Sequence, residues 1–169
     1  MLLENLLKSL EAQDLSTNIS LEIIVVDNDE ANSARDILTK FKSSEIIQFK
    51  YFRQPIKNIS LTRNLSVLNA TGDFICFIDD DETASINWMQ NLYNAVTFYN
   101  ADGAFGYVEA IFDKAIPLDL QKREYYFSTL GETGTEAEAY FTTNAIIKAS
   151  IIKSERMPFD PDYGLTGGE

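Results

Sequence analysis

The fold is decided by the stretch Asp73-Phe74-Ile75-Cys76-Phe77-Ile78-Asp79-Asp80-Asp81-Glu82, in which a short apolar run passes directly into four consecutive carboxylates. The apolar run has the length and composition of a buried strand. Four adjacent acids repel one another, and a divalent cation at the end of the strand would offset that repulsion. The stretch therefore predicts a strand that ends at a cation site, with a solvated acidic turn as the alternative.

A repeating order of strand, polar loop and helix extends on both sides of this stretch. Apolar runs at 21–26, 46–52 and 74–78 are typical of strands without polar alternation. Four groups of apolar residues recur at helical spacing and predict four helices. The groups are Leu3, Leu6, Leu7 and Leu10; Ala34, Ile37, Leu38 and Phe41; Leu61, Leu65 and Leu68; and Ile86, Met89, Leu92, Tyr93, Val96 and Tyr99. Ser60 is the expected N-cap of the third helix. This order predicts an α/β fold with a mostly parallel sheet, helices on both faces, and ligands at the carboxyl ends of the strands.

The composition of the chain limits the number of domains, the kinds of partner and the cellular compartment that can be expected. A chain of 169 residues that is 45% hydrophobic suits one globular domain with a sizeable core. The net charge, 14 minus 26 or −12, argues against nucleic acid or an anionic membrane as the main partner. The single cysteine, Cys76, forms no internal disulfide and is compatible with a reducing compartment. Glu4, Lys8 and Glu11 interrupt the N-terminal apolar stretch, which therefore reads as an amphipathic helix rather than an export signal.

Two acidic loops follow strands and so are expected at one edge of the sheet. They are Asp27-Asn28-Asp29-Glu30 and Asp79-Asp80-Asp81-Glu82. Strand alternation sends the side chains of Asp79 and Asp81 to the same side, where they offer hard oxygen ligands to Mg²⁺ or Mn²⁺. An ion held in this way is free to bridge a diphosphate. The chain has neither the spacing of a calcium-binding EF-hand nor a Gly-rich phosphate loop.

Four segments, in order, resemble motifs of the family 2 glycosyltransferases of the GT-A fold, which use nucleotide-diphosphate sugars. They are Ile24-Val25-Val26-Asp27-Asn28; Ser60-Leu61-Thr62-Arg63-Asn64; Gly72 to Glu82 with Trp88 after it; and Thr143 to Lys148 with Gly167-Gly168-Glu169 at the close. The resemblance spans residues 1–169 and implies one Rossmann-like, three-layer α/β/α domain. Residues 1–100 would form its nucleotide-sugar-binding half and residues 101–169 its acceptor-side half.

The resemblance also implies a reaction and a location in the cell. The expected enzyme is an inverting transferase that moves a sugar from a nucleotide-diphosphate donor to a saccharide or lipid-linked acceptor in surface polysaccharide synthesis. We expect it in the cytoplasm, with peripheral association of the full-length protein at the inner face of the membrane. Mn²⁺ or Mg²⁺ would be held by Asp81 and Asp79; Asp27, Arg63, Asp79 and Asp80 would contact the nucleotide; Asn144 and Trp88 would face the acceptor; and Glu169 would assist the catalytic base.

The chain departs from the family pattern at both ends. The family's first strand is missing from this sequence, which begins in the helix that follows that strand, so the neighbouring strand edges are expected to be unpaired. The aspartate that usually acts as the base follows the position of Glu169. We therefore interpret the chain as a fragment of a longer enzyme. Two other functions stay open, namely nucleotide-sugar binding without turnover, and nucleotidyl transfer, which would call for a basic Gly-rich loop.

Structural roles are alternatives for the same residues. Asp27 is a candidate cap for the helix near Ala31, for which Asp29 and Asn28 are at least equally suitable. Arg63 is a candidate for a surface ion pair. Asn144 suits a turn or strand edge, and Trp88 suits the core or a groove wall. The segment from Gly103 to Asp113 alternates as a strand does. Residues 117–138 lack a clear period, which predicts a loop with helical pieces over the acceptor side.

Overall fold

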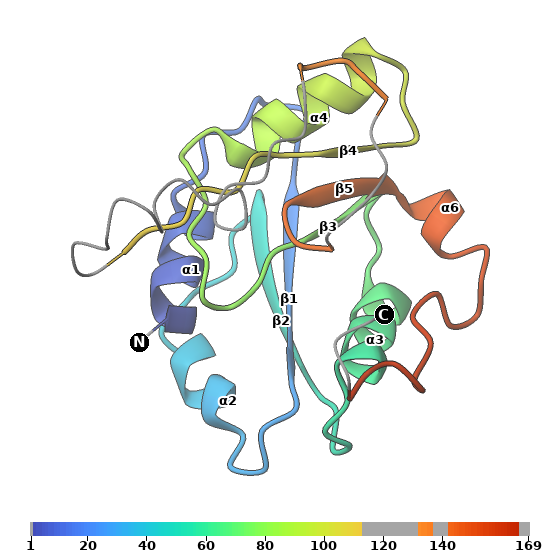
Figure 1. Cartoon of the computed structure of the whole chain (residues 1–169). Coiled ribbons are helices and arrows are strands. Elements are labelled where there is room, and N and C mark those ends of the chain that lie inside the picture. Colours follow the sequence, from blue (N-terminus) through green and yellow to red (C-terminus); the bar gives the residue numbers. More distant parts are fainter. Residues whose placement is uncertain (1, 113–131, 137–141, 166–169) are drawn as a thin grey trace.

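The computed structural model describes residues 2–112, 132–136 and 142–165, and its elements alternate between helix and strand as far as α4 (Figure 1). In chain order they are α1 (Leu2–Glu11), β1 (Leu21–Asp27), α2 (Ser33–Leu38), β2 (Ile47–Arg53), α3 (Ile59–Asn69), β3 (Phe74–Phe77), α4 (Trp88–Phe98), β4 (Gly103–Phe105), β5 (Ala145–Lys148) and α6 (Ala149–Ile152). Within these residues no helix is long and apolar enough to cross a membrane. Glu169 and most of the predicted loop at 117–138 lie outside the described residues.

The strands of the described residues form two sheets. β1 and β2 pair in parallel over their whole length, from Leu21 opposite Ile47 to Asp27 opposite Arg53. β5 lies between β3 and β4 and runs antiparallel to both. The predicted α/β fold is confirmed, and the antiparallel strand β5 enters from a distant part of the sequence. Among the described strands, β1, β2, β3 and β4 each pair along one edge only, which does not single out the neighbours of a missing strand.

Helices cover both sides of the β1–β2 pair. α1 and α2 lie on one side and α3 on the other, while α4 lies against β4 and β5 (Figure 1). Three apolar clusters form the core. Leu6, Leu7 and Leu10 of α1 pack on Ile23 of β1; Leu92 and Val96 of α4 pack on Ile146 of β5; and Val67 of α3 packs with Ile75, Ala149, Ile152 and Phe159. This apolar burial drives the layers together.

Cys76 belongs to the core, as predicted. It packs against the cluster formed by α4 and β5, and its Sγ lies 3.8 Å from the Met89 Sδ. Burial raises the pKa of the Cys76 thiol to about 12. The thiol is therefore protonated and unreactive at neutral pH.

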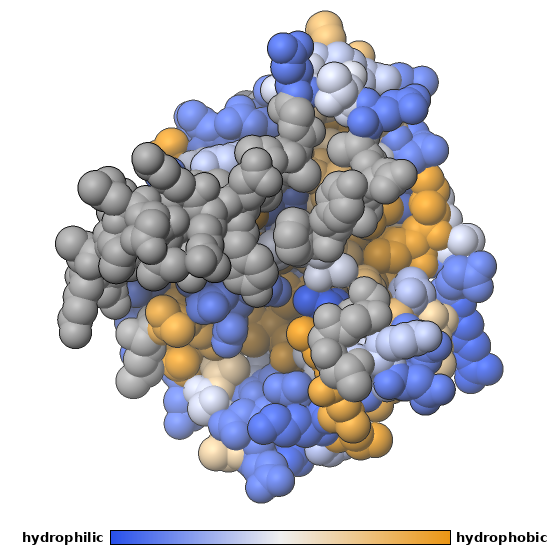
Figure 2. All heavy atoms as spheres, in the orientation of Figure 1, coloured by the Kyte–Doolittle hydropathy of each residue, from blue (hydrophilic) through white to orange (hydrophobic). Residues whose placement is uncertain are grey.

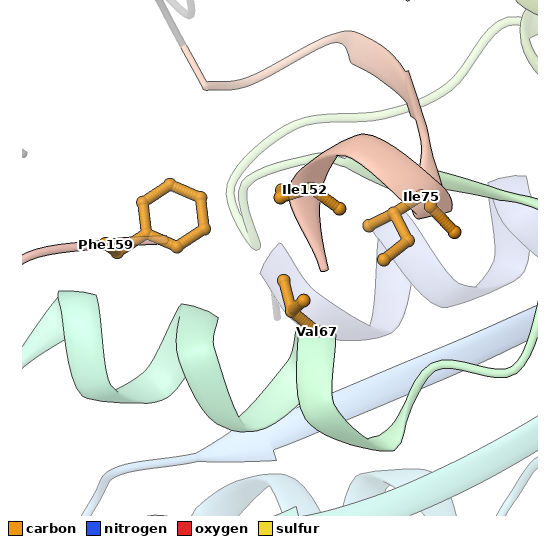
Figure 3. Close-up of a cluster of buried hydrophobic side chains, with 5 residues drawn as sticks. Val67, Ile75, Ile152 and Phe159 are labelled. Carbon is orange, nitrogen blue, oxygen red and sulfur yellow. The ribbon is translucent and has the colours of Figure 1, made fainter. Parts of the chain in front are cut away.

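The third cluster joins α3 to the C-terminal part of the chain. Figure 3 shows Val67, Ile75, Ile152 and Phe159 converging from α3, β3, α6 and the segment after α6. The Phe159 ring meets the Phe77 ring edge to face, with the centroids 5.4 Å apart. The segment carrying Phe159 is thereby brought against the carboxyl end of β3.

Hydrogen bonds attach the same segment to the start of α3. Asn64 Nδ2 donates to the Phe159 carbonyl at 2.7 Å, and its Oδ1 accepts from the Phe159 N–H at 3.0 Å. The Ile59 N–H donates to the Gly164 carbonyl at 3.0 Å. Figure 2 shows hydrophobic surface at the base of the molecule. Ile56, in the β2–α3 connection, and Leu165, after Gly164, are both exposed.

The structure corrects three details of the predicted helices. Asn58, not Ser60, caps α3, because the Asn58 Oδ1 accepts the Leu61 N–H at 2.9 Å while Ser60 is fully buried inside the helix. Val67 rather than Leu68 faces the core of that helix, and Leu68 is 76% exposed. The third correction concerns α4, which begins at Trp88, so that Ile86 lies in the preceding turn and is exposed. The predicted strand at 103–113 is shorter than expected and ends at Phe105.

Candidate functional site

The acidic run follows β3 at the carboxyl end of that strand. β3 ends at Phe77, and a turn closes with the Glu82 N–H donating to the Asp79 carbonyl at 3.2 Å. Asp79, Asp80 and Asp81 are exposed, whereas Glu82 is half-buried. Three of the four acids therefore present their carboxylates outward from the end of a buried strand.

Arg63 reaches the acidic run from α3. Its guanidinium Nη2 lies 3.8 Å from Asp79 Oδ1 and its side chain is only 13% exposed. The guanidinium also lies over the Phe159 ring, 5.7 Å from the centroid. Burial lowers the pKa of Arg63, and the charge of Asp79 opposes that shift. The structure thus brings together two residues that the sequence assigned to the nucleotide, and the ring of Phe159 supports one of them.

The charges around Asp79 favour a cation. Burial raises the pKa of the Asp79 carboxyl, Arg63 lowers it, and the neighbouring Asp81 and Asp80 raise it further. Like charges held this close are relieved by a positive ion. Carboxylate oxygens are suitable donors for Mg²⁺ or Mn²⁺, which usually keep several ligands from water or a bound phosphate. Asp79 and Asp81 lie in the turn beyond β3, so strand alternation does not orient them as predicted, and a divalent ion held by these two carboxylates stays a prediction.

Two carboxylates alone would not complete the coordination shell of such an ion. Among the described residues no group of three or more His, Cys, Asp or Glu side chains converges as a metal-binding cluster. Mg²⁺ sites built from one or two carboxylates are completed by substrate phosphates.

Asp27, at the end of β1, is in a different environment. It is only 5% exposed, and its Oδ1 accepts the Asp29 N–H at 2.9 Å. Its Oδ2 accepts the Ala34 N–H at 3.0 Å and the Tyr51 hydroxyl at 3.1 Å. The carboxylate thus holds its own loop, the first turn of α2 and the neighbouring strand. These contacts agree with the structural alternative, in which Asp27 caps the following helix. A contact between Asp27 and the nucleobase stays a prediction.

Trp88 and Asn144, both assigned to the acceptor side, contact each other. The Trp88 Nε1 donates to Asn144 Oδ1 at 2.7 Å, and Asn144 Nδ2 donates to the Tyr107 carbonyl at 2.8 Å. Asn144 is 8% exposed and has a φ of 50°, a left-handed conformation that Asn tolerates better than most residues. Its side chain joins the first residue of α4 to the chain beyond β4. Their contact with an acceptor stays a prediction.

Sequence reasoning missed the residues that hold the segment between the acidic run and α4. Ser9 Oγ accepts the Ala84 N–H at 2.9 Å. Gln13 Nε2 donates to the Ser85 carbonyl at 2.7 Å, and Gln13 Oε1 accepts the Met89 N–H at 2.9 Å. Gln13 is a buried polar residue beside an apolar helix face, but no local pattern names its partners. These contacts fix the acidic segment to α1.

Thr143 is a second residue whose role was missed. Its hydroxyl donates to Glu82 Oε2, the oxygen that also accepts the Asp79 N–H at 3.2 Å. The Glu82 pKa is raised by burial, lowered by the Thr143 and Asp79 hydrogen bonds, and raised by the charges of Asp79 and Asp81. Glu82 therefore points into the protein while the three acids before it face outward. Glu169, which is predicted to assist the catalytic base, lies outside the described residues.

Comparisons with known proteins agree with this arrangement. The model of the family described as Glycosyl transferase family 2 matches residues 2–155. The chain is 29% identical over 163 residues to the succinoglycan biosynthesis protein ExoM of Rhizobium meliloti (strain 1021), covering 96% of this chain and 53% of ExoM. It is 23% identical over 158 residues to the putative glycosyltransferase EpsH of Bacillus subtilis (strain 168), covering 89% of this chain and 45% of EpsH. The chain thus spans about half the length of these relatives.

Solved structures show the same fold. Residues 1–349 of S. aureus TarS in complex with UDP superpose with a TM-score of 0.69 at 18% identity, over 96% of this chain and 47% of that one. The complex of the same TarS segment with UDP-GlcNAc gives a TM-score of 0.65 at 18% identity, over 90% of this chain and 43% of that one. The predicted GT-A fold is confirmed. Together the matches support the glycosyltransferase interpretation rather than the nucleotidyltransferase one.

Proposed function

Because this chain belongs to glycosyltransferase family 2, we propose that it forms the donor-binding part of a transferase that uses a nucleotide-diphosphate sugar. The observation that carries the proposal is the approach of the Arg63 guanidinium to within 3.8 Å of Asp79, beside the exposed Asp80 and Asp81. A cationic fork and outward-facing carboxylates at the end of a buried strand are the groups that recognise a nucleotide and a metal-bound diphosphate. The complexes of TarS with UDP and UDP-GlcNAc support this class of donor.

In this proposal, different residues of the site bind different parts of the donor. Asp81 and Asp79 would hold Mg²⁺ or Mn²⁺, and Lewis-acid stabilisation of the departing diphosphate is the chemistry that such an ion supplies. Arg63, kept in place by Phe159, would donate to the nucleotide, and Asp80 would face the ribose. Asp27 would accept a hydrogen bond from the base in addition to holding its loop.

The transfer step completes the proposal. A hydroxyl of the acceptor attacks the anomeric carbon, the bond from that carbon to the diphosphate breaks, and a general base takes the hydroxyl proton, so that the anomeric configuration is inverted. Glu169 would orient the base. We propose a saccharide or lipid-linked acceptor of surface polysaccharide synthesis, which the name of ExoM supports. For the full-length protein we propose a cytoplasmic place at the inner face of the membrane.

Ligand-induced stabilisation tests donor binding. At about 100 times the dissociation constant, UDP or UDP-GlcNAc with Mn²⁺ should add about 2.7 kcal/mol, which raises the Tm by roughly 5 to 10 °C. Asp81→Ala should remove this shift. Asp36→Ala, which removes an exposed carboxylate from α2, is the matched control and should keep it. The absence of a shift with any nucleotide would overturn the proposal, and a transfer assay separates turnover from binding alone.

A further inference from the structure

Two consecutive residues just before β5 hold both ends of the segment that carries the acidic run. Thr143 donates to Glu82, and Asn144 accepts from Trp88 at 2.7 Å. The segment between these two contacts is also attached to Ser9 of α1 and to Gln13, two residues after that helix. The exposed acids therefore lie at one end of a segment that is fastened from two directions.

The side chain of Glu82 is more buried than the side chains of the three acids before it. It is half-buried, and its Oε2 accepts both the Thr143 hydroxyl and the Asp79 N–H. The second of these bonds acts on the backbone of the residue that faces Arg63. The Glu82 carboxylate therefore connects the Asp79 backbone to the Thr143 side chain.

A site that binds a cation with few protein ligands depends on their placement. Carboxylates must be held within about 0.5 Å of the productive geometry, by neighbours whose own conformations are fixed. Adjacent acids in an exposed turn repel one another and would otherwise spread apart. The Glu82–Thr143 contact is a side-chain link between this turn and the residues just before β5.

We propose that Glu82 and Thr143 form a positioning pair, which fixes the backbone of the acidic turn so that Asp79 and Asp81 can receive a divalent cation with its diphosphate. In this role Glu82 orients the ligands without being one of them. The inference rests on the proposed function, since it names the residues that preorganise the same site. Groups that orient metal ligands usually change metal affinity by about 10- to 100-fold when they are removed.

Calorimetric binding of UDP in the presence of Mn²⁺ tests the pair. Thr143→Val keeps the shape of the side chain and removes the hydroxyl, so the dissociation constant should rise about tenfold. Thr143→Ser restores a hydroxyl and should return the constant to near the wild-type value. Thr97→Val is the matched control, because among the described residues the Thr97 hydroxyl bonds within α4, to the carbonyls of Tyr93 and Asn94. The Tm of each variant without ligand shows whether it is folded.

A double-mutant cycle separates positioning from direct ligation. If Glu82 acts through its contact with Thr143, then Thr143→Val should add little to the effect of Glu82→Ala, since both remove the same link. Additive effects, with Glu82→Ala far more severe than Thr143→Val, would identify Glu82 as a direct ligand and overturn the inference. Wild-type affinity in folded Thr143→Val would also overturn it and leave the proposed function intact. Failure of the wild-type chain to bind UDP with Mn²⁺ would overturn both.

Discussion

The acidic loops after β1 and β3 have similar sequences, but the first aspartate is buried in one loop and exposed in the other. Asp27, after β1, is 5% exposed and accepts hydrogen bonds from its own loop, from α2 and from Tyr51. Asp79, after β3, is exposed and faces Arg63 at 3.8 Å. The difference arises from where the next helix begins, since α2 begins at Ser33 and covers Asp27, whereas α4 begins only at Trp88. In this chain, an acid at a strand end is therefore buried or exposed according to where the next helix begins.

The largest expected effect on stability is at the buried loop. Asp27→Ala leaves the Ala34 N–H and the Tyr51 hydroxyl without their acceptor, and we expect the free energy of unfolding to fall by about 3 kcal/mol. Urea denaturation measures this loss. Asp81→Ala, in the exposed run, should change the same quantity by no more than about 0.5 kcal/mol. Equal losses for the two variants would remove the distinction between the loops.

A smaller effect is expected where α4 begins. Trp88→Phe removes the indole N–H and leaves the buried Asn144 Oδ1 without its donor, which should cost about 1.5 kcal/mol. Tyr93→Phe on the same helix keeps the edge-to-face contact with Phe74 and serves as the control. Thermal denaturation compares the two. A Trp88→Phe protein as stable as the control would show that this hydrogen bond does not anchor the segment.

The smallest effect concerns the exposed run and depends on pH. Burial, together with Asp81 and Asp80, outweighs Arg63 and raises the pKa of Asp79 in the folded state. A raised pKa means that the contribution of Asp79 to stability is greatest below its usual pKa and is lost as the pH rises through the raised value. Because Asp79 is half-exposed, Asp79→Asn should stabilise the protein at neutral pH by less than about 1 kcal/mol.

Melting curves at several pH values measure the difference between Asp79→Asn and the wild type. The gain in Tm should be present at neutral pH and should disappear in acid, where the wild-type carboxyl is also uncharged. A variant less stable than the wild type at neutral pH would mean that the Arg63 contact dominates. The expected gain would show that the exposed run is kept at a cost in stability, as binding sites often are.

The order of elements could be predicted because its signals are local. The apolar runs at β1, β2 and β3 and the leucine spacing of α1 are properties of neighbouring residues. The cap of α3 was placed two residues too late, because Asn58 and Ser60 are both suitable caps and only the structure shows which one accepts the Leu61 N–H. Local patterns therefore identify elements better than their ends.

The site could be predicted only in part, because its contacts join distant segments. The run at Asp79 to Asp81 and the presence of Arg63 were identified from sequence, and the structure brings them together. The link from Glu82 to Thr143 depends on β5 pairing antiparallel with β3, which the β-α rhythm does not encode. Likewise, nothing in the spacing of Trp88 and Asn144 indicates that they bond to each other.

Binding of Mn²⁺–pyrophosphate, measured by calorimetry, tests most directly whether the exposed acids and not the buried one form the cation site. Pyrophosphate has no base or sugar, so the measurement reports only the metal and diphosphate contacts. We predict that Asp79→Ala with Asp81→Ala weakens binding at least about tenfold, while folded Asp27→Asn binds within about twofold of the wild type. Equal weakening by Asp27→Asn, or unchanged binding by the double variant, would contradict the account.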